Sequence, residues 1–312
     1  MTSGASSVCG SSRSRGYVKV GTLAAAQLLK VLPRARISRA IGQLSDRPLS
    51  PAVSKAVVRL YSKAWGVDLS EAERPNHSGA FESFDQFFTR RLRPGAREIP
   101  ADGDVVLCPS DGRLQSCGPI DEDGRLQVKG QPYRVADLID DEGAQPFRGG
   151  QFAVIYLSPR DYHRVHSPAA GEVIEVRSAP GDLFPVNSLG ERIPGLLARN
   201  RRVAITIDAG RFGRIAVVMV AAMVVGRITV TGWDAADVPL GRLTPAEPLM
   251  LAAGDELGVF HLGSTVVLLL EGDAIEPIRR ATGPIRLGDV LAAGRASAGA
   301  DGTSQENSRG RA

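Results

Sequence analysis

The sequence predicts an α+β protein in which N-terminal amphipathic helices are followed by a β-rich domain. Two observations favour this fold class. From residue 23 to about residue 65 the apolar residues recur with a helical period, whereas after Phe81 short β-branched runs alternate with Gly, Pro and Asp. The hydrophobic fraction of 43% and the charged fraction of 23% are typical of an ordinary folded protein.

This change of composition divides the chain into four segments. Residues 1–16 and residues 295–312 are rich in small and polar residues, so we expect two disordered tails that bury too little apolar surface to fold. Residues 17–75 form a predicted basic helical region. Residues 76–294 form the predicted β-rich domain, which begins just ahead of an aromatic cluster at Phe81.

Proline residues divide the helical region into three short predicted helices, with breaks at Pro33 and at the pair Pro48 and Pro51. The third helix has the clearest start. Ser50 is expected to cap it, and Pro51 suits its first turn because that position needs no backbone hydrogen-bond donor.

Two of these helices are predicted to be amphipathic and basic. The second places Ile37, Ala40, Ile41 and Leu44 opposite Arg36 and Arg39, and the third places Val53, Val57, Leu60 and Ala64 opposite Lys55, Arg59 and Lys63. Such a pattern is typical of a solvated helix surface, and equally of a helix that lies on anionic lipid. Both interpretations stay open at this point.

Short apolar runs predict the strands of the second part. They are Val105–Leu107, Phe152–Leu157, Val173–Val176, Val203–Ile207, Ile215–Val225 and Val266–Leu270. The longest apolar run is well below the roughly 20 residues of a membrane-spanning helix, and no secretory signal precedes it. If the protein meets a membrane, it is therefore expected to lie on the surface.

Charge and cysteine content exclude some classes of function. A net charge of +4 is too mild to predict a nucleic-acid partner. The three cysteines, Cys9, Cys108 and Cys117, contain no paired motif, so we expect neither a disulfide framework nor a zinc site.

Two of the four histidines, His163 and His166, follow a predicted strand in a loop broken by proline, with Asp161 nearby. The spacing admits zinc, but His77 and His261 offer no paired motif for a third ligand. We therefore expect acid–base chemistry and no metal. Two loop histidines without a role remain an alternative.

Two further sites carry candidate groups. Asp111 lies in the turn Pro109–Gly112, which is either ordinary turn chemistry or a buried carboxylate that orients an imidazole. Ser264 follows Gly263 directly before a predicted strand. Gly263 would let the backbone adopt a strained conformation that exposes its carbonyl to the Ser264 hydroxyl, and such strain favours an N-to-O acyl shift.

Five segments then occur in a characteristic order: Phe87–Arg97, Pro109–Gly112, Tyr156–Pro168, Gly181–Asn187 and Leu262–Thr265. Together they resemble the successive signature blocks of the phosphatidylserine decarboxylase precursors. The resemblance spans most of the chain, from the basic helices to the strand after Ser264.

The resemblance implies roles for individual residues. Asp111, His166 and Ser264 would form a self-cleavage triad, and the chain would be cut between Gly263 and Ser264. Ser264 would become the pyruvoyl cofactor, on which the amine of phosphatidylserine forms a Schiff base before carbon dioxide leaves. His163 would serve that decarboxylation, yielding phosphatidylethanolamine in phospholipid biosynthesis.

The resemblance also implies partners and a location. It implies a peripheral enzyme on the cytoplasmic face of the cell membrane, bound to an anionic lipid surface through residues 17–75. The large and small chains would stay associated, and many members are homodimers. Arg164 and Asn187 are our candidates for holding the substrate phosphate.

Three rival functions stay in view. A serine hydrolase would use the same residue types, but no Gly-x-Ser-x-Gly motif surrounds Ser264. A pyruvoyl-dependent decarboxylase could act on another amine-bearing acid, and a non-catalytic protein could bind lipid through the basic helices alone.

Overall fold

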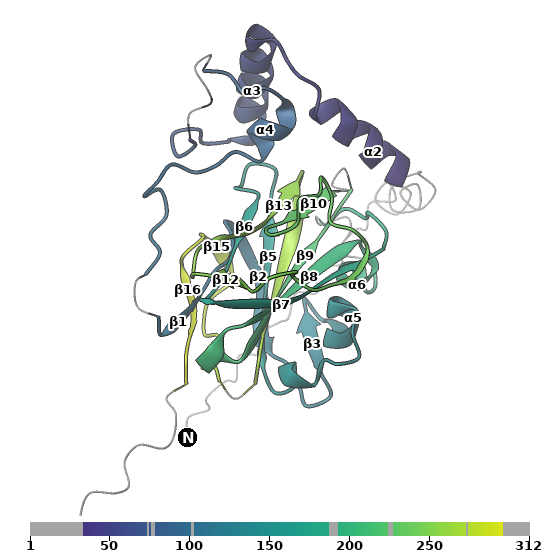
Figure 1. Ribbon diagram of the computed structural model, residues 1–312, viewed down its shortest axis with the longest axis vertical. Coiled ribbons are helices and arrows are strands. Elements are labelled where there is room, and N and C mark those ends of the chain that lie inside the picture. The colour runs from purple at the N-terminus through teal and green to yellow at the C-terminus, as the bar shows by residue number, and fades with distance from the viewer. Residues whose placement is uncertain are drawn as a thin grey trace, which may run out of the picture. The chain divides into compact units, whose positions relative to one another are not determined.

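The computed structural model describes residues 34–73, 75, 79–100, 103–186, 193–223, 227–272 and 274–295, and Figure 1 shows how their elements are arranged. Residues 33–312 belong to one compact unit. The first predicted helix, His77, Asn187 and almost all of the two predicted tails lie outside the described residues. The division of the chain near residue 75 stays a prediction.

A nine-stranded antiparallel sheet is the centre of the fold. Its strands are β2 (Gly112–Pro119), β5 (Gln151–Leu157), β7 (Gly171–Ala179), β8 (Arg202–Asp208), β9 (Arg214–Val220), β11 (Gly241–Leu243), β12 (Leu249–Leu251), β14 (Ser264–Leu270) and β15 (Gly283–Ile285). The strand order is β11-β7-β8-β9-β14-β5-β2-β15, and β12 also pairs with β7. Helices together with many antiparallel strands make this a mixed, β-rich fold, as the sequence predicts.

Strand β14 is buried on both of its faces. Val266, Leu268 and Leu270 point into one hydrophobic cluster, while Val267 and Leu269 point into another. Because successive side chains of a strand point to opposite faces, a strand between two cores needs an unbroken apolar run. This explains why the apolar run Val266–Leu270 could be recognised as a strand from the sequence.

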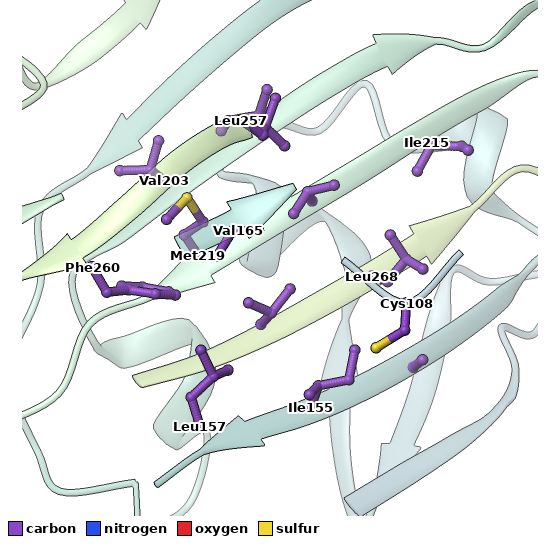
Figure 2. Close-up of a cluster of buried hydrophobic side chains, with 14 of the residues drawn as sticks. Cys108, Ile155, Leu157, Val165, Val203, Ile215, Met219, Leu257, Phe260 and Leu268 are labelled. Carbon is purple, nitrogen blue, oxygen red and sulfur yellow. The ribbon is translucent and has the colours of Figure 1, made fainter. Parts of the chain in front are cut away.

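Three smaller sheets complete the β structure. Their strands are β10 (Arg227–Val230), β13 (Glu256–His261) and β6 (Arg164–His166), paired in that order; β1 (Val105–Leu107) with β16 (Val290–Ala293); and β3 (Arg125–Val128) with β4 (Gln131–Arg134). Figure 2 shows Val165 and Phe260 of the three-stranded sheet in the same cluster as Leu157 and Met219 of the large sheet. The three-stranded sheet therefore covers one face of the large sheet.

Short helices cover the other face. Helix α5 (Val135–Ile139) and helix α6 (Leu196–Arg199) contribute Val135, Leu138 and Leu197 to the second cluster. Two 3₁₀ turns, η1 (Gln145–Phe147) and η3 (Gly210–Phe212), lie in connections between strands.

In the described part of the chain, three helices precede the sheets: α2 (Arg34–Ser45), α3 (Pro51–Trp65) and α4 (Phe84–Phe88). Helix α3 begins after Ser50 and has Pro51 in its first turn, as expected. The Ser50 side chain makes no capping bond, however, so that prediction was wrong. Gly66 ends the helix in the left-handed conformation at φ 72°, where glycine has no steric penalty. None of the described helices is long and apolar enough to cross a bilayer.

Helix α3 packs through a different face from the apolar stripe seen in the sequence. Ser54 and Val58 are its buried residues, and the Ser54 hydroxyl donates to the Phe81 carbonyl at 2.7 Å. Val53 and Leu60 are 48% and 72% exposed. The predicted apolar stripe is thus largely left uncovered by the described chain.

Candidate active site

Three segments far apart in the sequence meet at one end of the two main sheets. The backbone N–H of His166 donates to the Pro109 carbonyl at 2.8 Å, and that of Phe260 donates to the His163 carbonyl at 3.0 Å. In the large sheet, Ser264 lies opposite Leu157. Sheet pairing thus brings the segments that carry Asp111, His163 and His166 next to one another and next to β13, the strand that precedes Ser264.

Glycine at position 112 allows the first of these segments to approach closely. A Cβ atom built on Gly112 would lie 2.4 Å from the Tyr156 carbonyl oxygen. Only glycine fits at such a distance, so the Pro109–Gly112 turn can lie directly against the end of β5.

Ser264 is the first residue of β14, whereas the sequence predicted that this strand begins at Val266. Its side chain is 1% exposed, and its hydroxyl has no hydrogen-bond partner within the described structure. A buried hydroxyl without a partner is costly, and native proteins seldom keep one without a reason. Such a group has no bond to break before it can act as a nucleophile.

The backbone strain lies one residue earlier than the sequence suggested. Leu262 has φ 87°, whereas Gly263 is not among the residues with positive φ. The left-handed region costs a residue with a side chain roughly 1–3 kcal/mol. The strained residue is therefore Leu262, next to the Gly263–Ser264 bond.

His261 fixes the upstream end of this strained segment. Its Nδ1–H donates to the Asp85 carboxylate at 2.8 Å, and Arg227 pairs with the same carboxylate at 3.2 Å. Arg227 also holds Asp46, just after α2, at 2.5 Å. Sequence reasoning dismissed His261 for lacking a paired motif, although its position three residues before Ser264 could have indicated a role.

His166 is held in one tautomer by the backbone. Its Nδ1 lies 2.7 Å from the Gly254 carbonyl, and because a carbonyl only accepts, the proton is on Nδ1. Nε2 therefore carries the lone pair and accepts from the Tyr162 hydroxyl at 3.0 Å. Burial lowers the pKa of His166, so the ring is neutral, and its one lone pair, on Nε2, faces the Tyr162 hydroxyl.

Within the described chain, Asp111 and His166 have other hydrogen-bond partners than each other. Arg97 binds the Asp111 carboxylate through Nε at 2.9 Å and Nη2 at 2.5 Å, and the Leu287 N–H donates to it at 2.9 Å. Arg97 also holds Glu71 at 2.8 Å. The Asp111 charge nevertheless raises the pKa of His166, against the larger lowering by burial. Arg97 ends the first of the five characteristic segments, but the sequence did not indicate that it binds Asp111.

His163 is completely buried, with 0% exposure. Its Nδ1–H donates to the Asp161 carbonyl at 2.8 Å, its ring lies 4.1 Å from that of Phe88, and its Nε2 has no partner within the described chain. Burial, helped by the Arg90 charge, lowers its pKa to about 3. Sequence patterns do not show such burial, so this lowered pKa could not be predicted from them.

Of the two residues proposed to hold the substrate phosphate, the structure describes only Arg164. The Arg164 guanidinium is already engaged, with Nε on the Thr89 carbonyl at 2.8 Å and Nη1 on Glu256 at 2.6 Å. Asn187 lies outside the described residues. Within the described chain, no cluster of three or more His, Cys, Asp or Glu could hold a metal ion.

Self-processing at a serine requires a free hydroxyl, a strained peptide segment before it, and a neutral base. Ser264, Leu262 and the buried imidazoles meet these requirements. These features favour the class of self-processing precursors. Comparison with known proteins gives the family: residues 84–293 match the phosphatidylserine decarboxylase family, and the chain belongs to it.

Individual relatives match a longer part of the chain than residues 84–293. The chain is 40% identical over 272 residues to a phosphatidylserine decarboxylase proenzyme of Marinobacter nauticus, covering 84% of this chain and 94% of that protein. A proenzyme of the same name from Bordetella petrii is 40% identical over 273 residues, covering 83% and 93%. One from Acinetobacter baumannii is 41% identical over 249 residues, covering 79% and 87%.

Proposed function

We propose that this chain is a proenzyme that cuts itself between Gly263 and Ser264 and then decarboxylates phosphatidylserine to phosphatidylethanolamine. Family membership supports the reaction. The observation that carries the proposal is the buried Ser264 hydroxyl, which has no partner in the described chain and follows the strained Leu262. This orphaned polar atom also fits the pyruvoyl group that Ser264 would become.

Maturation begins at the Ser264 hydroxyl. Nε2 of His166 takes its proton, and the oxygen attacks the Gly263 carbonyl, so that the peptide becomes an ester. Removal of the Ser264 Cα proton then expels the Gly263 carboxylate, and hydrolysis of the resulting dehydroalanine releases ammonia and leaves a ketone. Asp111 assists through its charge, which favours the protonated imidazole.

The new small chain is expected to stay with the large one. It would begin at Ser264, and β14 pairs with β5 on one side and β9 on the other. β15 and β16 of the same chain pair with β2 and β1. Cutting one peptide bond leaves all these ladders in place, so the two chains remain one folded unit.

During turnover the pyruvoyl group supplies the electron sink for decarboxylation. His163 is the residue we assign to the substrate's Cα. Because its ring is neutral and Nε2 has no partner in the described chain, it can take a proton from the substrate amine and return it to carbon. The surrounding apolar residues limit access of water to this proton.

Exposed apolar residues support docking of the helices on a membrane. Leu44 of α2 is 63% exposed, and Val53, Leu60 and Trp65 of α3 are 48%, 72% and 52% exposed. Lys55, Arg59 and Lys63 lie on the same helix. This combination favours interfacial, amphipathic helices on the anionic, cytoplasmic face of the cell membrane. Homodimer formation stays a prediction.

The activity test uses vesicles of phosphatidylserine mixed with a neutral lipid. Wild-type protein is expected to release carbon dioxide and form phosphatidylethanolamine, whereas Ser264→Ala is expected to bind the vesicles without turnover. Free serine is supplied as the competing substrate. Preference for free serine would support the soluble-acid alternative, and vesicle binding without any turnover by the wild type would support the lipid-binding alternative.

A further inference from the structure

Arg90, two residues after α4, is a buried cation without an acidic partner among the described residues. Within that part of the chain its side chain makes hydrogen bonds through Nη2, to the carbonyls of Arg160 at 3.0 Å and Asp161 at 3.5 Å. The residue is 6% exposed, and its Nε has no partner within the described chain. No carboxylate among the described residues pairs with it. A buried guanidinium without a counter-ion is costly unless a ligand supplies one.

Arg90 lines a cavity of about 270 Å³, which is large enough for a charged head group. The other arginines that line it have acidic partners: Arg97 holds Asp111 and Glu71, Arg286 holds Glu71, and Arg160 lies 3.7 Å from Asp161.

The acids of this cavity are likewise engaged by donors. Asp161 accepts from the N–H and the hydroxyl of Ser158 at 2.7 and 2.6 Å, and Asp68 accepts from the Ser70 N–H at 2.8 Å. Arg97 holds the other two lining acids, Glu71 and Asp111. Among the described residues, Arg90 is therefore the lining arginine that has no carboxylate in direct contact.

The cavity adjoins both histidines of the site. The Asp161 carbonyl that Arg90 contacts also accepts the Nδ1–H of His163. Tyr162, which lines the cavity, donates its hydroxyl to Nε2 of His166. An anion on Arg90 would thus lie beside the loop that carries the acid–base groups.

We propose that Arg90 binds the phosphodiester of the substrate head group in this cavity, through Nη1. A guanidinium forms charge-assisted hydrogen bonds with phosphate oxygens, and contacts to a group that does not react can position the one that does. The proposal rests on the proposed function, since it presumes that the substrate is a phospholipid. Free phosphate shares the same chemistry, so the test separates the two sources.

The experiment measures inhibition of the mature enzyme by three probes: glycerophosphoethanolamine, ethanolamine and inorganic phosphate. We expect Arg90→Gln to weaken inhibition by glycerophosphoethanolamine about tenfold or more, and to leave ethanolamine unchanged. Arg91→Gln is the matched control, because Arg91 is 62% exposed and lies 3.5 Å from Glu256. If Arg90→Gln weakened inhibition by glycerophosphoethanolamine and by ethanolamine equally, or weakened neither, the proposal would be overturned. Inorganic phosphate that binds as tightly as glycerophosphoethanolamine would overturn the head-group assignment.

A second measurement does not depend on any variant folding. A crystal structure of the mature wild-type enzyme with glycerophosphoethanolamine is expected to place phosphate oxygens within hydrogen-bond distance of Arg90. Phosphate bound elsewhere would refute the proposal. Failure of the proposed function is distinguishable, because a wild type without the pyruvoyl group or without turnover would reveal it before either measurement.

Discussion

His163 and His166 are three residues apart, yet their surroundings differ in almost every respect. His163 is fully buried against Phe88 with Nε2 unpartnered in the described chain, whereas both ring nitrogens of His166 have partners. Along an extended chain, an odd spacing turns two side chains to opposite faces. One short segment can therefore provide two bases that differ in basicity and in the groups they reach.

The largest effect expected from this comparison is on maturation. His166→Ala should slow self-cleavage by about 10²–10⁴-fold, because the hydroxyl of Ser264 loses its base. Denaturing electrophoresis over time after synthesis measures the fraction cut. His77→Ala is a control outside the proposed machinery. Cleavage of His166→Ala at the wild-type rate would remove His166 from the mechanism.

Substitution of His163 should affect turnover and leave self-cleavage unchanged. His163→Ala is expected to be cut normally but to lose about 10²–10⁴-fold in kcat, since no group remains to move the proton at the substrate's Cα. Intact mass and carbon dioxide release from the same sample separate the two steps. Loss of cleavage as well would assign the maturation base to His163, whose Nε2 has no partner in the described chain.

A change at Leu262 sharpens the comparison without touching either imidazole. Leu262→Gly relieves the left-handed strain, so self-cleavage should slow by about fivefold to thirtyfold if roughly 1–2 kcal/mol of that strain is released on reaching the transition state. Leu262→Ala keeps a Cβ and thus the strain, and is the matched control. Equal rates for the two variants would show that strain at Leu262 does not drive the cut.

The smallest effect concerns stability against pH. The pKa of His163 is lowered from 6.5 to about 3, so the unfolded chain binds more protons than the folded one between these values. The free energy of unfolding should therefore fall as pH decreases below about 6.5. Urea denaturation of His163→Phe, compared with wild type at several pH values, should show a shallower fall. An identical slope would contradict the neutral, buried state of His163.

The sequence predicted those parts of the fold that local pattern determines. β5, β8, β9 and β14 are central strands with unbroken apolar runs, and each was found within a few residues, although β9 ends at Val220 and not at Val225. β2 was missed because its Gly, Arg, Gln and Ser residues show no strand signal. Its pairing with β5 and β15 makes it a strand.

The segments that carry the predicted site residues lie side by side in the described chain, whereas the contacts of those residues were not predicted. His261 meets Asp85 across 176 residues, and His166 meets the Gly254 carbonyl across 88. Such partners depend on sheet register, which no local period encodes. The same holds for the pKa of His163, because its burial results from packing against Phe88.

The intact mass of the purified wild-type protein under denaturing conditions tests the central claim most directly. Self-cleavage predicts two chains, residues 1–263 and 264–312, with the smaller one lighter than its encoded mass by one ammonia. Ser264→Ala should give a single chain of full mass. A wild-type chain that stays uncut after prolonged incubation would contradict the proposed maturation, and with it the source of the catalytic group.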